Sequence, residues 1–281
     1  MSLLWINGQL IDKSEACISP FDHGFLYGDG VWIGLRVFGG RLFQAEMQVQ
    51  NLVNAATLLA IPIPVPASDL ITAIDATVRA NHRTDGYVRV IVTRGLGTIG
   101  PDPRKLDSQI IIIAEEYQPF PAPLAGHGLH VVTFPDPIDT FLPVSRIATL
   151  GQLYLVNARR HALRNGCLDA LLLNHDRELI GATEGTLFWS KGDTWIMANH
   201  LPDSTAEICR DLLKELGRTI SDGPRDRTSL LGADEAFLAG TSCGVIAIIR
   251  VDNHDIGSGV EGALTREIRQ RYHVRTRGEV G

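Results

Sequence analysis

Two helical segments follow one another in the first half of the chain. Residues 45–60 place apolar side chains at the three- and four-residue intervals of a helix, which the prolines within 62–66 end. A second helix is predicted from Ser68 to about Ala80, because serine favours the N-cap position. Short strands are predicted at 3–12, 34–44, 87–94 and 110–114, with a polar, glycine-rich loop between the first two.

The second half also mixes helices with strands. A helix is predicted from about Gly151 to Gly166, since glycine suits the position after a helix C-terminus. Ser204-Thr205-Ala206-Glu207 is typical of a capping box, and the helix that it opens is expected to stop near Gly217. Strands are predicted at 129–134, 170–173, 236–238 and 245–251, a hairpin at 187–197, and a final helix at 261–273.

Three alternate prolines, Pro119, Pro121 and Pro123, interrupt any regular element near the middle of the chain. Such a stretch is typical of a connection between domains. We therefore expect a first domain at 1–118, a linker at 119–127 and a second domain at 128–281.

The composition argues against several classes of protein. The 281 residues are 44% hydrophobic and 21% charged, which is ordinary for a globular chain, and the net charge of -6 argues against nucleic acid as a partner. No apolar run reaches the roughly 18 residues of a membrane span, and the N-terminus lacks the pattern of a signal peptide. The four cysteines show no metal-binding spacing, so a cytoplasmic protein without a metal site is expected.

One block of sequence is specific enough to indicate a family. The stretch from Phe21 to Trp32 reads FDHGFLYGDGVW, GLRV follows at 34–37, and a Val-Thr-Arg-Gly segment ends at Gly95. With the helix and strand that flank Gly166, these residues make the chain similar to the class IV aminotransferases, which are pyridoxal-phosphate enzymes of fold type IV. That family includes branched-chain and D-amino acid aminotransferases and aminodeoxychorismate lyase.

The resemblance implies an α+β fold of two domains, with a small α/β N-terminal domain and a larger β-barrel-like C-terminal domain. In the family, a lysine forms a Schiff base with the cofactor, and counting back from Gly166 and Asp169 places that lysine at Ala148. An amine nucleophile is needed for this bond, and a methyl group cannot supply one.

Two further cofactor contacts of the family have also changed. The arginine that grips the cofactor phosphate falls on Asn51, and its loss removes a charge-assisted contact of about 2–4 kcal/mol. The glutamate that pairs with the pyridine nitrogen falls on Gly181 in an ungapped count, or on Glu184 in a gapped one.

The phosphate contacts of the second domain are partly kept. The Gly-Ile-Thr helix start that offers backbone amides to the phosphate corresponds to Glu207-Ile208-Cys209, where a glutamate would repel an anion. The last phosphate contact is kept at Thr241, beside Ser242. The resemblance also implies four residues on the substrate side: Tyr27, Trp32, Arg36 and Arg94.

Several residues are candidates for the work of the missing lysine. Arg146 could offset the phosphate charge, Tyr154 lies near where the family places a tyrosine against the cofactor, and Thr149 could orient a water. A hydroxyl is a poor base, however, because its pKa lies far above 7. Lys105 occupies a basic loop, and His23 is more typical of a structural loop histidine than of a catalytic base.

The preferred hypothesis is an aminotransferase that holds pyridoxal or pyridoxamine phosphate without a covalent bond and acts on an amino acid or amine and a keto acid. Two alternatives stay open. One is a pseudoenzyme or small-molecule-binding dimer without pyridoxal phosphate, and the other is a cofactor-free enzyme in the same cleft. The resemblance also implies a homodimer, because family members complete the site with a loop from the partner subunit.

Overall fold

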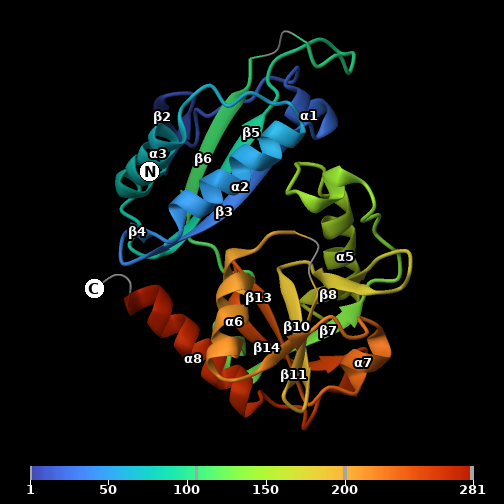
Figure 1. Ribbon diagram of the computed structural model, residues 1–281. Coiled ribbons are helices and arrows are strands. Elements are labelled where there is room, and N and C mark those ends of the chain that lie inside the picture. Colours follow the sequence, from blue (N-terminus) through green and yellow to red (C-terminus); the bar gives the residue numbers. More distant parts are fainter. Residues whose placement is uncertain (1, 105–106, 199–200, 279–281) are drawn as a thin grey trace. The chain divides into compact units, whose positions relative to one another are not determined.

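The computed structural model describes residues 2–104, 107–198 and 201–278, and the chain forms two compact units (Figure 1). The first unit contains residues 1–117 and also 143–152, and the second contains 118–142 and most of the chain after 153. The segment 143–152 thus packs with the first unit, whereas the predicted division at the linker 119–127 assigns it to the second domain.

The first unit is built on an antiparallel sheet of six strands. Its strand order is β2-β1-β6-β5-β3-β4. The strands are β1 (Leu3–Ile6), β2 (Gln9–Asp12), β3 (Gly30–Phe38), β4 (Arg41–Leu42), β5 (Gly86–Thr93) and β6 (Gln109–Glu115). The helices are α1 (His23–Tyr27), α2 (Ala45–Leu58) and α3 (Ala67–Ala80).

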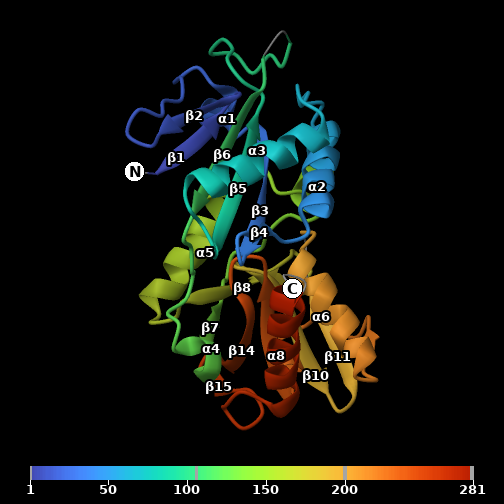
Figure 2. The same cartoon turned by 90° about the vertical axis from the view of Figure 1, so that its left-hand side faces the viewer.

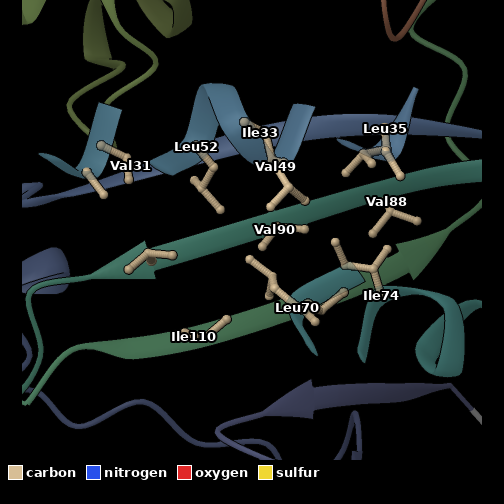
Figure 3. Packing of buried hydrophobic residues seen from close by; sticks show 14 of the residues in the cluster. Val31, Ile33, Leu35, Val49, Leu52, Leu70, Ile74, Val88, Val90 and Ile110 are labelled. Atoms are coloured by element: carbon tan, nitrogen blue, oxygen red, sulfur yellow. The ribbon is translucent and has the colours of Figure 1, made fainter. Parts of the chain in front are cut away.

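Helices α2 and α3 cover one face of this sheet. Alternate residues of β3, among them Val31, Ile33 and Leu35, point into a core that Val49 and Leu52 of α2 complete (Figure 3). Because strand side chains alternate between faces, the residues between them point to the other face of the sheet. That second face carries the polar residues of β3 that matter below.

The second unit is built on a larger mixed sheet, in the order β12-β11-β10-β13-β14-β7-β8-β9, with β15 paired to β14. Its first strands are β7 (Leu129–Thr133), β8 (Asp169–Leu173), β9 (Leu179–Ala182), β10 (Thr186–Lys191) and β11 (Thr194–Ala198). They are followed by β12 (Thr219–Ser221), β13 (Glu235–Gly240), β14 (Gly244–Val251) and β15 (His254–Asp255). The two ends of the order approach each other, since β9 contacts β10 and β11, so the sheet curls.

Five helices of this unit accompany the curled sheet in the described residues. They are α4 (Leu124–His127), α5 (Leu153–Arg164), α6 (Ser204–Glu215), α7 (Arg227–Leu231) and α8 (Ala263–Gly278). Helices α6 and α8 lie side by side in both views (Figures 1 and 2), and α8 packs on β13 and β14. Helix α5 instead packs on β7 and β8.

Most predicted elements are confirmed, and several of their ends are wrong. Strand β3 begins at Gly30 and not at 34, because the end of the glycine-rich stretch pairs with β5. Helix α3 begins at Ala67 without a side-chain cap, so Ser68 does not cap it. Asp203 and not Ser204 caps α6, a difference that bears on the site. Among the described residues, no helix is long and apolar enough to cross a membrane.

Candidate functional site

Residue 148, the lysine position implied by the resemblance, is held on strand β3 by backbone contacts. The amide of Trp32 donates to the Ala148 carbonyl at 3.0 Å, and the Leu150 amide donates to the Gly30 carbonyl at 3.0 Å. The Trp32 indole adds a bond to the Thr149 carbonyl at 3.2 Å. The backbone at residue 148 is therefore fixed against the sheet, while the alanine side chain carries no amine.

Cations and aromatic rings gather on the second face of the same sheet. The guanidinium of Arg89 lies 3.9 Å from the centre of the Trp32 ring. Arg36 donates to the Tyr117 carbonyl at 3.3 Å and lies over the Phe38 ring. A cation over an aromatic face is stabilised by the ring quadrupole. This face suits a ligand with a carboxylate and an apolar or aromatic part.

Arg94 is buried by contacts within the first unit. Its guanidinium contacts both carboxylate oxygens of Asp29 and donates to the carbonyls of Leu59 and Ala60 at 2.8 and 3.0 Å. The residue is 8% exposed. These contacts tie the end of β5 to the turn before β3, and the predicted substrate contact of Arg94 stays a prediction.

His23 is a buried structural residue, as its sequence context indicated. Its ring contacts the Thr98 carbonyl at 3.1 Å through Nε2 and packs edge-on against Tyr27. Tyr27 itself is 45% exposed, so its hydroxyl stays available for the predicted substrate contact. Lys105, also considered above, lies outside the described residues.

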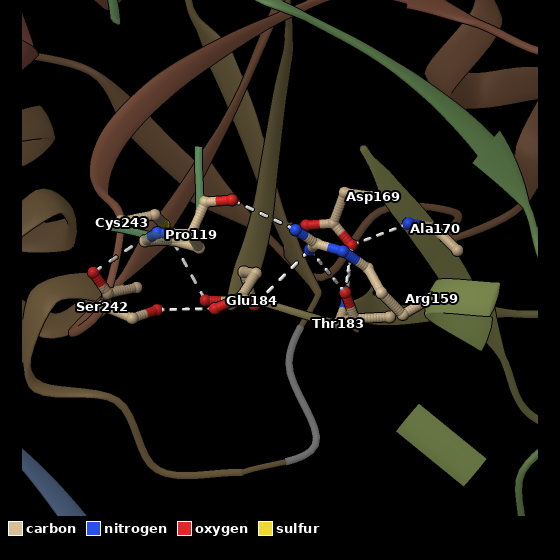
Figure 4. A network of polar contacts seen from close by, with 9 residues as sticks. Pro119, Arg159, Asp169, Ala170, Thr183, Glu184, Ser242 and Cys243 are labelled. Atoms are coloured by element: carbon tan, nitrogen blue, oxygen red, sulfur yellow. Dashed lines mark hydrogen bonds and ion pairs between the residues drawn. The ribbon is translucent and has the colours of Figure 1, made fainter. Parts of the chain in front are cut away.

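A polar network occupies the second unit between α5 and two turns of the sheet (Figure 4). Arg159 on α5 is paired with Glu184 at 3.4 Å and donates to the Pro119 carbonyl at 3.2 Å. The Ser242 hydroxyl donates to the other oxygen of Glu184 at 2.7 Å. Glu184, the gapped candidate for the pyridine contact, is thus already engaged by a cation and a hydroxyl.

Asp169 lies at the edge of this network and is fully buried. One carboxylate oxygen accepts from the Ala170 amide at 2.7 Å, the Thr183 amide at 3.0 Å and the Thr183 hydroxyl. Its other oxygen has no hydrogen-bond partner among the described residues. Burial raises the pKa of Asp169 to about 6, against the lowering effect of the Thr183 bond, and the nearby Glu184 charge raises it further.

The start of helix α6 forms a set of amide donors around one carboxylate. Asp203, the N-cap, accepts from the amides of Thr205 at 2.8 Å and Ala206 at 3.1 Å through the same oxygen. Its second oxygen accepts from the Thr241 amide at 3.2 Å, which belongs to the turn between β13 and β14. Burial raises the pKa of Asp203 to about 6, although these three bonds oppose the shift.

This geometry bears on the phosphate contacts that the resemblance implies for Ile208 and Cys209. Helix α6 begins at Ser204, so the first-turn amides that have no partner within the helix precede Ile208 and Cys209. Ile208 and Cys209 are buried one turn inside the helix. Glu207 is ion-paired with Arg210 on the same helix and makes no capping-box bond in the structure. The amides that could hold a phosphate are therefore those of Thr205 and Ala206.

The other predicted positions lie in different surroundings. Gly181 lies on β9 with a φ of 128°. Residues other than glycine rarely adopt this backbone conformation, so a glutamate would be strained there. Asn51 lies half-buried on α2, and Arg146 is exposed. Tyr154 is on α5, where burial raises the pKa of its phenol.

Four side chains of these clusters were missed as site residues by the sequence reasoning: Arg89, Arg159, Asp169 and Asp203. A signal existed for Asp203, because aspartate is among the strongest N-cap residues and directly precedes the predicted capping box. Arg159 carried no signal beyond its place in a helix, since its partner is 25 residues away in the chain.

The residues at α6 can be tested against the phosphate of pyridoxal phosphate. Three amides from two elements converge on one carboxylate, so that the Asp203 side chain stands in for an oxyanion. This donor set fits a phosphate group once that carboxylate is displaced. At position 148, to which the resemblance assigns the covalent link of the family, the chain carries a methyl group.

Comparisons with known proteins agree with this fold along nearly the whole chain. A Methanocaldococcus jannaschii protein assigned to the branched-chain-amino-acid aminotransferases is 29% identical over 98% of this chain and 96% of its own length. The structure of the Escherichia coli branched-chain amino acid aminotransferase matches with a TM-score of 0.94 at 23% identity, over 99% of this chain and 95% of that one.

A second solved structure is that of the branched-chain aminotransferase of Thermoproteus uzoniensis with norvaline. It matches with a TM-score of 0.90 at 24% identity, over 99% of this chain and 95% of that one. The fold type IV architecture implied by the resemblance is thereby confirmed. The model of the amino-transferase class IV family matches residues 33–251. The chain therefore belongs to the class IV aminotransferase family and is similar to its branched-chain aminotransferases.

Proposed function

We propose that this chain carries out aminotransferase-type chemistry with pyridoxal or pyridoxamine phosphate held by non-covalent contacts. The observation that carries the proposal is similarity to branched-chain aminotransferases over 98% of the chain, combined with an alanine at the lysine position. The substrates would be an amino acid or amine and a keto acid.

The second unit supplies the phosphate contacts in this proposal. The amides of Thr205, Ala206 and Thr241 would hold the phosphate, with the Thr241 hydroxyl beside them. When bound, the cofactor supplies an electron sink for the transfer of an amino group. Because residue 148 has no amine, the chain's own contribution is to bind, orient and exclude water.

The remaining groups would orient the substrate and hold protons. The phenol of Tyr154 is protonated near neutral pH, because its ordinary pKa is already about 10 and burial raises it further, so it can donate a hydrogen bond. Arg36, Arg89 and Trp32 are the proposed contacts of the substrate's carboxylate and side chain. A branched aliphatic side chain fits beside such a ring.

Transfer of a labelled amino group tests this proposal. The protein is incubated with pyridoxal phosphate, a ¹⁵N-labelled branched-chain amino acid and a keto acid that differs from its deaminated product. Mass spectrometry should find label in the new amino acid at a rate above that of free cofactor and of heat-denatured protein. A rate equal to these backgrounds for all branched-chain donors would contradict the proposal.

A second function is favoured by the contacts of Asp203 and by the φ of Gly181. In this function the protein binds a small molecule other than pyridoxal phosphate. The Asp203 carboxylate already occupies the amides that would hold a phosphate. The backbone at Gly181, the ungapped position of the pyridine contact, would strain a glutamate. Titration with pyridoxamine phosphate separates the two functions. Absence of binding at millimolar concentration, in folded protein, supports this second function.

We also propose that the protein is a homodimer. Segments 21–25 and 95–99 lie side by side, since the Gly97 amide donates to the Phe21 carbonyl at 3.0 Å. They expose an apolar patch made of Phe21, Phe25, Leu96 and Ile99, of which Phe25 is 73% and Ile99 74% exposed. Apolar patches of this kind are typical of interfaces, and a second copy of the chain would cover it.

A further inference from the structure

We propose that Asp203 is a tethered competitor for phosphate at the start of helix α6. Its carboxylate uses both oxygens to hold three amides, two from the first turn of α6 and one from the β13–β14 turn. An N-cap aspartate needs only the first two bonds. The third bond, from Thr241, closes the same site from a separate element.

Each backbone amide has one N–H, so these amides cannot serve two anions at once. The Thr205 hydroxyl contacts the Tyr272 hydroxyl of α8 at 3.3 Å, and both residues are buried. A phosphate can therefore use these amides only when the Asp203 carboxylate has left them. A carboxylate displaced by a rotation of its side chain would still lie close to the phosphate and would repel it.

No cation offsets this negative charge within the part of the chain that the structure describes. None of the ion pairs of that part includes Asp203, and the neighbouring Arg210 is paired with Glu207. The charged and titratable groups that act on Asp203, or on which it acts, are Glu207, Cys209 and Cys243. Burial raises the pKa of both thiols well above its usual value, so they stay neutral and Glu207 adds repulsion.

The inference rests on the proposed function only for the identity of the natural anion, and it concerns a contact which that function does not need. It makes wild-type protein a weak binder of phosphate groups whether or not the protein transfers amino groups. It also makes oxyanion binding tighten as the pH falls through about 6, where Asp203 takes up a proton.

The experiment measures binding of sulfate and of pyridoxamine phosphate by calorimetry to wild type and to Asp203→Gly, Asp203→Asn and Asp226→Gly. Glycine is itself a favoured N-cap residue and costs little relative to aspartate there, so the fold should survive. Asp226 is the matched control, because it caps α7 through the Ser229 amide and is exposed. Sulfate keeps its charge between pH 5 and 8, so any pH dependence belongs to the protein.

We expect Asp203→Gly to tighten sulfate binding by about tenfold or more at pH 7.5, because it removes a charge and frees three amides. The sulfate affinity of Asp203→Asn should lie between those of wild type and Asp203→Gly, since asparagine removes the charge but keeps a capping oxygen. Asp226→Gly should bind as wild type does. The amide NMR signals of Thr205 and Thr241 should shift on titration of Asp203→Gly with sulfate.

Equal sulfate affinities for wild type and folded Asp203→Gly would overturn the inference. Amide shifts elsewhere in the chain, with those of Thr205 and Thr241 unmoved, would overturn it too. The proposed function fails separately. Tight binding of pyridoxamine phosphate by Asp203→Gly without transfer of an amino group by either protein sinks the function and supports the inference. Amino-group transfer by wild-type protein that binds pyridoxamine phosphate as tightly as Asp203→Gly does would support the function and overturn the inference.

Discussion

Two carboxylates of the second unit are shifted in opposite directions by their surroundings. Asp169 has one oxygen without a partner among the described residues and a pKa raised to about 6, mainly by burial. At Asp252 burial also raises the pKa, but bonds from Thr133 and Arg227 outweigh it and leave the pKa lowered. Each carboxylate accepts three hydrogen bonds, so donor number does not decide the outcome. Asp252 is less buried than Asp169 and one of its donors is the charged Arg227, and these two differences lower its pKa.

The pH dependence of stability should change sign between substitutions of these two residues. The native pKa of Asp169 lies above its unfolded value of 3.8. Its contribution to the free energy of unfolding is therefore complete below pH 3.8 and lost as the pH rises through about 6. Asp169→Asn cannot ionise and keeps an oxygen for the Thr183 and Ala170 bonds, so it should lose less stability than wild type between pH 4 and 7.

Urea unfolding at pH 4, 5, 6 and 7 measures this difference. Asp252→Asn is the matched control, because the lowered pKa of Asp252 makes its contribution present above pH 3.8 and lost on the acid side. A folded Asp169→Asn variant whose stability falls as much as that of wild type between pH 4 and 7 would refute the assignment.

Position 148 should accept a lysine that reacts with the cofactor. Its backbone is held on β3 by the Trp32 amide, so Ala148→Lys introduces the amine without a change of frame. Borohydride treatment with pyridoxal phosphate should then label residue 148, as peptide mass spectrometry can show, whereas wild type should show no single labelled lysine. Combining it with Asp203→Gly should lower the cofactor concentration required, and an unlabelled residue 148 in that double variant would show that the amine lies too far from the cofactor.

At the scale of elements, Arg159 joins parts of the second unit that are distant in sequence. It connects α5 with the β9–β10 turn through Glu184 and with the start of the unit through the Pro119 carbonyl. Glu184 in turn binds Ser242 in the β13–β14 turn, whose Thr241 amide binds Asp203. The network and the start of α6 are therefore connected through one turn.

Removal of Arg159 should lower the free energy of unfolding by about 1–3 kcal/mol, because it leaves a largely buried Glu184 carboxylate with one partner fewer. Arg271→Ala is the control. Its pair with Glu267 is exposed, and such pairs contribute about 0.3–0.5 kcal/mol. A double-mutant cycle with Glu184→Gln should give a coupling energy above the error of the method. Additive effects would show that the pair contributes nothing.

Element types were predictable from the sequence, and side-chain partners were not. The hairpin at 187–197 and the helix at 45–60 follow from local periodicity, and the structure has them as β10–β11 and α2. The start of β3 at Gly30 could not be predicted locally, because it depends on pairing with Thr93 in β5. The amides on Asp203 come from residues up to 38 positions away, so their convergence is a property of the fold.

At the scale of the whole molecule, the central question is what the family scaffold still binds and how it assembles. The fold is that of branched-chain aminotransferases over 99% of the chain. The motif at 21–32 predicted the family, which the comparisons confirm. The lysine position at Ala148 and the glutamate position at Gly181 or Glu184 stay predictions. The capping-box pattern placed the start of α6 within one residue, but the cap itself was missed, because it is Asp203, which directly precedes that pattern.

Assembly should depend on the apolar patch of the first unit. Phe25→Glu and Ile99→Glu place a charge on side chains that are 73% and 74% exposed, and should shift the protein from dimer to monomer at micromolar concentration. Val274→Glu, on α8 and 71% exposed, is the control and should leave the assembly unchanged. Sedimentation equilibrium measures the masses. A wild-type monomer, or a dimer that survives both substitutions, would show that the patch has another role.

The measurement that tests the central claim most directly compares the affinities of wild type for pyridoxal phosphate and for pyridoxamine phosphate. Pyridoxamine phosphate carries the same phosphate and ring but cannot form a Schiff base with a lysine. If all contacts are non-covalent, the two dissociation constants should agree within about threefold, and both should fall in Asp203→Gly. Much tighter binding of pyridoxal phosphate, with one lysine labelled after borohydride treatment, would contradict the account and identify a covalent anchor elsewhere in the chain.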